Sequence, residues 1–500
     1  MKRRNLGLAV LAATLAPTGS ALATGFLTAR FGGEHGSPTT DNATAMYYNP
    51  AGLALGSGTR VFIDGTVAWV KATFDRDPAS VYPVIPAGQT KCPTTGTPSC
   101  LGTLADNIGQ NSGKATLFNV AAAPFLGVVS DFGVPNLGVG LGFYVPFGGA
   151  SVWDSKSKYK SDKLAPGAFD GAQRWWSIEG TLRSLYFTAA GAYTIPEARL
   201  SFGLSLNLVV SEIQTIRARN VSGMDEMVSQ DAAGRIKVEE GRSRIDVKGT
   251  NLSMGAGVIW KPTDDLFLGL SYQSQPGFGK MKLKGDLDLS YDAGPVETSK
   301  IRLEEELPDI IRLGGRWRVN PQWEARLSGE FDRWSVFNRQ CLVVDGAKDG
   351  ACALDSKGDP KPGVDSSVIV QNLKRDWQNA FAVRGGASYF LSDWVELFGG
   401  VGFDGNAVPD KTIDPALPDF NDLSAGVGTK LKLLADNSLA LATSYTQIFY
   451  ISRDIKPRAD KDGNGVPDSG LNSPTSLQPD AAGKYERAIG VFNLNVEYTF

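Results

Sequence analysis

The chain has 500 residues, of which 50 are Lys or Arg, 53 are Asp or Glu, and only one is His. This mild acidity gives no reason to expect a nucleic acid partner. A Ser-His or Cys-His catalytic pair would need His35, which lies in the turn-rich stretch GGEHGSP and is expected to be an exposed loop residue. The sequence also has no Walker loop and no dinucleotide-binding glycine pattern. We therefore expect no enzyme activity.

Residues 1–23 have the features of a secretory signal peptide. Residues 2–4 (KRR) are basic, residues 6–15 are apolar, and residues 21–23 (ALA) form a small-residue cleavage site. The apolar region is too short to span a bilayer, which takes roughly twenty residues. Cleavage leaves a mature chain of about 477 residues with 47 basic and 53 acidic side chains, a net charge of −6. The protein is therefore predicted to be exported.

Period-two alternation of apolar and polar residues runs through the chain from Thr59 onward. In RLSFGLSLNLV (199–209), Phe and Leu at even positions share one face, and Ser, Gly and Asn share the other. A soluble sandwich would bury the apolar face, whereas an outer-membrane barrel turns it to lipid and keeps the polar face in its lumen. Charged polar faces, such as Arg312, Arg316 and Arg318, and aromatics near strand ends favour the membrane barrel. The predicted fold class is an all-β, transmembrane, antiparallel outer-membrane barrel.

We predict about fourteen strands, an even number as bacterial barrels require. They are expected at 59–74, 114–130, 136–150, 182–194, 198–216, 241–260, 265–286, 297–318, 322–339, 374–390, 393–405, 421–434, 437–452 and 485–500. Short turns alternate with long loops, and outer-membrane barrels place the long ones outside. The long loops are 75–113, 151–181, 217–240, 340–373 and 453–484. The terminal aromatic Phe500 resembles the signal read by the barrel-assembly machinery.

The four cysteines form two local pairs within the long loops. Cys92 and Cys100 lie in one loop, and Cys341 and Cys352 lie in another. In an exported protein, two loop disulfides are the natural interpretation. Free buried cysteines remain the alternative, and a metal site is disfavoured because the single histidine is far from both pairs in sequence.

A series of short motifs resembles the FadL/TodX/OmpP1 family of outer-membrane transporters for long-chain fatty acids and other hydrophobic compounds. The motifs follow one another along the mature chain: NPAG (49–52), LGVGLGFYVPFGGASVW (137–153), LGLSYQS (268–274), LPDIIRLGGRWRV (307–319), FDRWSVF (331–337), VPDKTIDPALPDF (408–420) and VEYTF (496–500). No single motif is diagnostic alone, but the whole series in this order is strong evidence for the resemblance. The resemblance implies a fourteen-stranded barrel (59–500) and passive uptake of a hydrophobic small molecule.

The resemblance also implies that residues 24–58 form a hatch inside the lumen. Asn49 and Pro50 would set a rigid reversal, and Ala51 and Gly52 are small enough to pack inside a crowded barrel. The alternative is a plain linker turn. Residues before Asn49 cannot be matched one for one, because this stretch is shorter than in the family.

Lateral exit of the ligand into the membrane, through a gap at a kinked third strand, is the remaining implication. That strand should be 136–150. It contains proline and clustered glycines, which weaken a ladder and favour a bulge: Gly138, Gly140, Gly142, Pro146, Gly148 and Gly149. The alternative is an ordinary strand whose small residues pack against the hatch.

The stretch DKDGNGVPD resembles a calcium loop. Asp460, Asp462, Asn464 and Asp468 would occupy positions 1, 3, 5 and 9, but position 12, normally a glutamate, is Leu471. Ca²⁺ in the last long loop is thus a possible cofactor, and a solvated acidic loop is the alternative. No other cofactor is expected.

Three rival functions remain for the same fold. A non-specific porin would need an open lumen, which the segment 24–58 argues against. A lipase or protease would have to work without a suitable histidine, and an adhesin would use the long loops. We expect a monomer whose partners are the hydrophobic ligand, outer-membrane lipid and the assembly machinery.

Overall fold

A computed structural model describes most of the chain. The described residues are 30–81, 107–162, 165–220, 225, 227–230, 236–291, 295–353, 360–434, 438–458, 476 and 478–500. The signal peptide, residues 24–29, the Cys92/Cys100 pair and the calcium-like loop lie outside them.

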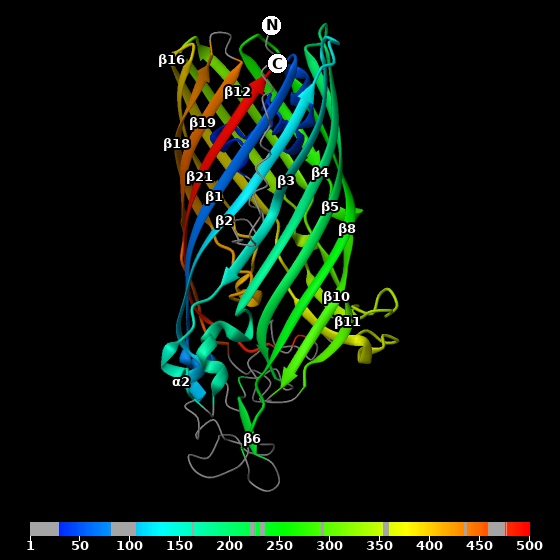
Figure 1. Cartoon of the computed structure of the whole chain (residues 1–500), viewed down its shortest axis with the longest axis vertical. Coiled ribbons are helices and arrows are strands. Elements are labelled where there is room, and N and C mark those ends of the chain that lie inside the picture. The colour runs from blue at the N-terminus through cyan, green and yellow to red at the C-terminus, as the bar shows by residue number, and fades with distance from the viewer. Residues whose placement is uncertain are drawn as a thin grey trace, which may run out of the picture.

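The strands form a closed antiparallel barrel of fourteen (Figure 1). Ten are continuous: β1 (Thr59–Arg76), β2 (Gly113–Ser130), β3 (Leu137–Val152), β4 (Glu179–Ile195), β5 (Leu200–Arg219), β8 (Gly241–Trp260), β17 (Val395–Asp404), β18 (Asp422–Leu433), β19 (Leu439–Tyr450) and β21 (Gly483–Thr499). The barrel closes where β1 pairs with β21, from Arg60 opposite Thr499 to Arg76 opposite Gly483. Closure removes the sheet edges that lipid cannot satisfy. The prediction of fourteen strands is confirmed.

The other four barrel strands are interrupted. They are β9 (Leu266–Gln273) with β10 (Lys280–Tyr291), β11 (Glu297–Glu306) with β12 (Ile310–Asn320), β13 (Trp323–Asp332) with β14 (Arg339–Val344), and β15 (Ile369–Lys374) with β16 (Ala380–Ser392). The sequence prediction placed β14 and most of β15 in a loop. Prolines explain two of the interruptions, since Pro276 and Pro308 cannot donate to a ladder.

The remaining elements are short. A hairpin, β6 (Val228–Gln230) and β7 (Ile236–Val238), and β20 (Arg453–Ile455) lie in the long loops. The α-helices are α1 (Ala45–Tyr48) and α2 (Asn107–Asn111). The 3-10 helices are η1 (Gly33–His35), η2 (Pro50–Leu55), η3 (Pro78–Ser80), η5 (Ser157–Tyr159), η6 (Pro166–Asp170), η7 (Ala172–Trp175), η8 (Pro276–Phe278), η9 (Trp334–Val336), η10 (Ser366–Val368) and η11 (Asp410–Thr412).

Helices of the described residues include none that is long and apolar enough to cross a bilayer.

The apolar face of the strands points outward and the polar face inward, as the alternation predicts. On β5, Leu204 is 68% exposed and Leu206 53%, whereas Ser205 is 6% and Asn207 1% exposed. The C-terminus lies at the end of the barrel with the short turns, and the longer loops lie at the other end (Figure 1). In outer-membrane barrels these ends face the periplasm and the exterior, respectively.

Candidate functional site

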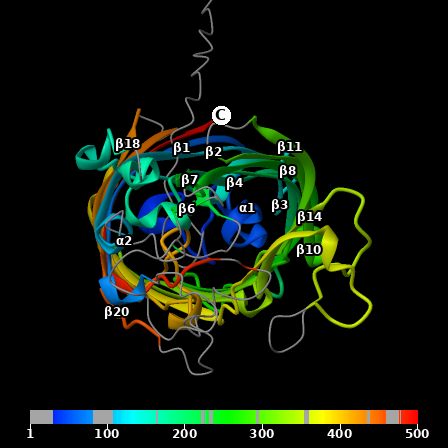
Figure 2. The same cartoon turned by 90° about the horizontal axis from the view of Figure 1, so that it is seen from below.

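The N-terminal segment, residues 30–58, lies inside the barrel, where α1 is surrounded by the strands (Figure 2). The Asn49 amide donates to the carbonyl oxygens of Pro38 at 2.8 Å and of Val258 at 3.1 Å. Its Oδ1 accepts from the Ala51 N–H at 3.1 Å and so caps η2. Asn49 therefore joins the turn before Pro50 to the barrel wall as well as to its own segment.

Glycines in the barrel wall make room for this turn. A Cβ on Gly257 would lie 1.9 Å from the Asn49 Oδ1, and one on Gly203 would lie 2.2 Å from the Ala51 nitrogen. Gly203 meets the backbone of Pro50 and Ala51, and Gly257 meets the side chains of Asn49 and Pro50, so both positions need a residue without a Cβ.

Charged groups of the wall also hold the N-terminal segment. Arg316 Nη1 lies 2.9 Å from Asp41 Oδ2. Burial alone would raise the pKa of Asp41, but the charges of Arg316, Lys430 and Arg60 and the hydrogen bond from Arg316 together outweigh it, and the pKa falls to about 2. Arg312 donates to the Tyr47 carbonyl oxygen at 3.2 Å, and its guanidinium lies 4.3 Å from the centre of the Tyr47 ring. The segment is thus bound by ionic and cation–π contacts in addition to packing.

His35 is not the exposed loop residue that the sequence led us to expect, so that prediction is wrong. It lies inside the barrel, its side chain 20% exposed, with Nε2 2.8 Å from Glu396 Oε1 and its ring 4.4 Å from that of Phe398. Burial lowers the pKa of His35, the Arg326 charge lowers it further, and Glu396 opposes both. The partner is 361 residues away in sequence, which local pattern reading cannot detect.

The six residues singled out on the third strand divide into two groups. Gly138, Gly140 and Gly142 face the N-terminal segment: an added Cβ would lie 2.3 Å from the Leu53 oxygen, 3.2 Å from the Met46 Sδ and 2.9 Å from the Met46 Cε, respectively. This is the packing role that the sequence left open as an alternative.

Pro146, Gly148 and Gly149 belong to the second group, at a bulge in β3. Tyr144 lies opposite Tyr186 and Phe147 opposite Ser184, so β3 has one residue more than β4 in this interval. Such a bulge bends a strand and interrupts its ladder.

The ladder between β2 and β3 ends at this bulge. The two strands pair only from Ser130 opposite Val139 to Phe125 opposite Tyr144. The next residue of β2 is Pro124, which has no N–H to donate. Residues 113–124 and 145–152, all described, form no β2–β3 pairs, and the two strands diverge toward the extracellular end (Figure 1). The barrel wall thus lacks a backbone ladder between residues 113–124 and 145–152.

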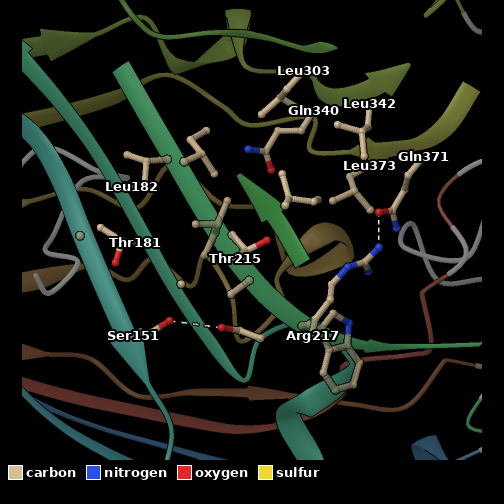
Figure 3. Close-up of a pocket in the computed structure, with 18 of the residues that line it drawn as sticks. Ser151, Thr181, Leu182, Thr215, Arg217, Leu303, Gln340, Leu342, Gln371 and Leu373 are labelled. Carbon is tan, nitrogen blue, oxygen red and sulfur yellow. Dashed lines mark hydrogen bonds between the residues drawn. The ribbon is translucent and has the colours of Figure 1, made fainter. Parts of the chain in front are cut away.

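A cavity of about 120 Å³ lies inside the extracellular half of the barrel (Figure 3). Its wall includes residues 149–151 of β3, which pair with β4 but not with β2. Most of the lining is apolar, with Leu182, Leu303, Leu342 and Leu373 pointing into the space (Figure 3). The cavity is therefore an apolar compartment next to the interrupted ladder.

One end of the cavity is cationic. Arg217 is 5% exposed and donates to the Gln371 Oε1, an interaction drawn in Figure 3. Gln371 in turn donates to the Ser476 oxygen at 2.6 Å. Among the described residues, none forms an ion pair with Arg217. A buried guanidinium without a direct ion-pair partner is costly, so this end favours an anionic or strongly accepting group.

Aromatic rings fill the lumen between the N-terminal segment and the cavity. Ring centres are 5.6 Å apart for Phe31 and Tyr144, 5.6 Å for Tyr144 and Tyr186, 6.2 Å for Tyr186 and Phe147, and 6.5 Å for Phe147 and Trp334. All five side chains are buried. The column connects the N-terminal segment with the bulge of β3.

The described residues include only some of the other predicted site residues. Cys341, on β14, and Cys352, in the loop between β14 and β15, form a disulfide. Cys92, Cys100 and the calcium-like residues Asp460, Asp462, Asn464 and Asp468 lie outside the described residues.

Known proteins resemble this chain in sequence and in fold. The sequence profile of the family described as "Outer membrane protein transport protein (OMPP1/FadL/TodX)" matches residues 12–500. The chain belongs to the FadL/TodX/OmpP1 family. It is therefore an outer-membrane transport protein and not an enzyme.

Two relatives match this chain over different shares of its length. An outer membrane protein of Neisseria meningitidis is 24% identical over 94% of this chain and 93% of its own length. The long-chain fatty acid transport protein of Escherichia coli K12 is 22% identical over 54% of this chain and 61% of its own length.

Solved structures show the same fold. A FadL homologue of Pseudomonas aeruginosa has a TM-score of 0.67 at 18% identity, covering 97% of this chain and 100% of that one. The toluene transporter TodX of Pseudomonas putida has a TM-score of 0.60 at 14% identity, covering 96% and 99%.

Sequence reasoning missed Pro124 and Arg217. Pro124 carried a local signal, since a proline inside an alternating strand marks an edge or a bulge. Arg217 carried none, because its burial depends on strands distant in sequence.

Proposed function

We propose that this FadL/TodX/OmpP1 member takes up amphipathic hydrophobic molecules and releases them sideways into the outer membrane between β2 and β3. The observation that carries the proposal is the missing β2–β3 ladder beside the apolar cavity, since residues 149–151 line both. A ligand in the cavity would leave through the stretch of wall that has no β2–β3 ladder, between the Phe125–Tyr144 pair and the Asp154 N–H bond to the Thr116 carbonyl oxygen.

The driving force in this proposal is burial of apolar surface. Each Å² removed from water contributes about 25 cal/mol, and lateral exit keeps an alkyl chain out of water throughout. No bond is made or broken, so uptake follows the concentration gradient.

Arg217 supports an anionic head group on the ligand. An alkyl chain along Leu182, Leu303 and Leu342 would place a terminal carboxylate near the guanidinium, which forms no ion pair with a described residue. Charge-assisted bonds from arginine to carboxylate are among the strongest polar contacts. Long-chain carboxylates therefore fit better than neutral hydrocarbons such as toluene.

The N-terminal segment is the proposed hatch. With Asn49, Pro50 and Ala51 packed against Gly203 and Gly257, and Gly52 packed against Thr40 of the same segment, it would close the periplasmic side to water. Ligand occupancy of the cavity need not move it, since the proposed exit lies above it.

Deleting Pro146 tests the lateral route. The deletion removes the extra residue of β3, so the strand can pair with β2 beyond Tyr144. We expect uptake of radiolabelled palmitate by cells to fall to background while the purified barrel still binds palmitate. Val145→Ala keeps the bulge and serves as the control. Normal uptake by a folded deletion variant would contradict the proposal, and a steady large conductance of the native protein in bilayers would favour a porin.

A further inference from the structure

Two buried arginines join the extracellular loops above the cavity. We call the described parts of these loops the cap. The cap comprises residues 77–81, 107–112, 153–162, 165–178, 225, 227–230, 236–240, 476 and 478–482.

Arg76, at the end of β1, is fully buried and holds three loops together. Its Nη1 lies 2.6 Å from Asp225 Oδ1, and its Nη2 lies 2.9 Å from Asp225 Oδ2. It also donates to the carbonyl oxygens of Asn111 at 3.0 Å and Asp480 at 2.9 Å. One guanidinium therefore fixes the loops that follow β1, β5 and β20.

Arg174 makes a second such junction. Its Nε and Nη2 each lie 3.0 Å from one oxygen of Glu240, and its Nη1 donates to the Gln110 oxygen at 3.0 Å. It also donates to Asn111 Oδ1 at 2.6 Å. Because Asn111 in turn donates to the Asp225 oxygen at 3.0 Å, the two arginine junctions form one network.

Trp176 links this network to the cavity. Its side chain lines the cavity, and the Arg76 guanidinium lies 4.9 Å from its ring centre. The neighbouring Trp175 has the same relation to Arg174, at 4.8 Å, and donates to Asn111 Oδ1 at 2.8 Å. Cation–π contacts strengthen when they are shielded from water, so both indoles support the buried charges.

We propose that Arg76 and Arg174 latch the cap over the cavity and that Trp176 couples the latch to occupancy of the cavity. A ligand chain that displaces the Trp176 indole removes the surface on which the Arg76 guanidinium rests, and the cap loosens. The ligand is the amphiphile of the proposed function, on which this inference rests.

Amide hydrogen exchange of the folded full-length barrel in detergent tests the latch without any ligand. Arg76→Ala removes the ion pair with Asp225, and Arg174→Ala removes one of the two arginines that pair with Glu240, the other being Arg242. Because the hydrogen bonds that Arg76 and Arg174 donate across the cap are lost, we expect peptides covering 107–112 and 172–177 to exchange about tenfold faster. Lys456→Ala is the matched control, because its ion pair with Asp454 at 2.6 Å is exposed. Exchange at the wild-type rate in both arginine variants would overturn the latch.

Trp176 variants test the coupling in the same assay. Trp176→Ala removes the ring and should accelerate exchange in residues 107–112, whereas Trp176→Phe keeps an aromatic face and should not. Palmitate should accelerate the same peptides in the wild type. Equal exchange in both tryptophan variants and the wild type overturns the coupling. Failure of palmitate to bind at all would instead count against the proposed function, and the variants would still decide the latch.

Discussion

Pro124 on β2 and Pro146 on β3 both lie just beyond the last pair of the β2–β3 ladder. The last pair joins Phe125 and Tyr144, and neither proline has an N–H to leave unsatisfied beyond it. A barrel wall in lipid cannot leave donors unpaired without cost. Two prolines therefore reduce the cost of a break in the ladder at this position.

Gly138→Ala should loosen the N-terminal segment. The new Cβ would lie 2.3 Å from the Leu53 carbonyl oxygen, and overpacking of this kind costs about 1–3 kcal/mol. We expect a lower unfolding temperature in detergent and faster amide exchange in residues 50–55.

Gly191→Ala on the neighbouring β4 is the matched control, because its Cβ would meet nothing within 4 Å. If both variants unfold alike, the close packing of Gly138 against the segment is not what stabilises it.

Replacing Arg217 should separate anionic from neutral ligands. Arg217→Gln keeps much of the side-chain volume but removes the charge, so palmitate should bind about tenfold to a hundredfold more weakly. Binding of hexadecane, which has no head group, should not change. Competition binding to the purified protein measures both, and an equal loss for the two ligands would show that Arg217 only shapes the cavity.

His35 should make the barrel less stable in mild acid. Burial lowers the pKa of His35 in the folded protein. The unfolded chain therefore binds the proton more readily, and the free energy of unfolding rises with pH between the folded and the unfolded pKa of His35. The stability that the neutral imidazole contributes is complete above the ordinary histidine pKa of about 6.5 and is lost as the pH falls through the pKa of His35 in the folded protein.

Unfolding temperatures of the wild type and His35→Gln between pH 7.5 and 5 measure this effect directly, since the chain has no other histidine. The wild type should lose stability relative to the variant as the pH falls. Parallel curves would mean that Glu396 holds the imidazole in the same state at every pH.

The calcium-like loop stays a prediction from sequence. Calorimetric titration of the refolded barrel with Ca²⁺ should show binding that Asp462→Ala abolishes, because position 3 supplies a carboxylate ligand. Identical titrations of the two proteins would dismiss the site.

The sequence by itself determined the barrel and its orientation of side chains. Apolar and polar residues alternate with a period of two, so a stretch such as 199–209 predicts which of its residues face lipid without information from any other strand. The count of fourteen followed because turn residues separate the alternating stretches. The disulfide between Cys341 and Cys352 could also be predicted from sequence, since the two partners are only 11 residues apart.

Only the tertiary structure decided where the barrel is broken and what fills it. The interruption of four strands, the burial of His35 against Glu396 and the end of the β2–β3 ladder all depend on register between distant segments. The glycines of β3 look alike in sequence, yet Gly138 packs against the N-terminal segment while Gly149 lines the cavity. The role of each β3 glycine depends on how far the N-terminal segment reaches into the lumen. The local sequence around a glycine does not determine that depth.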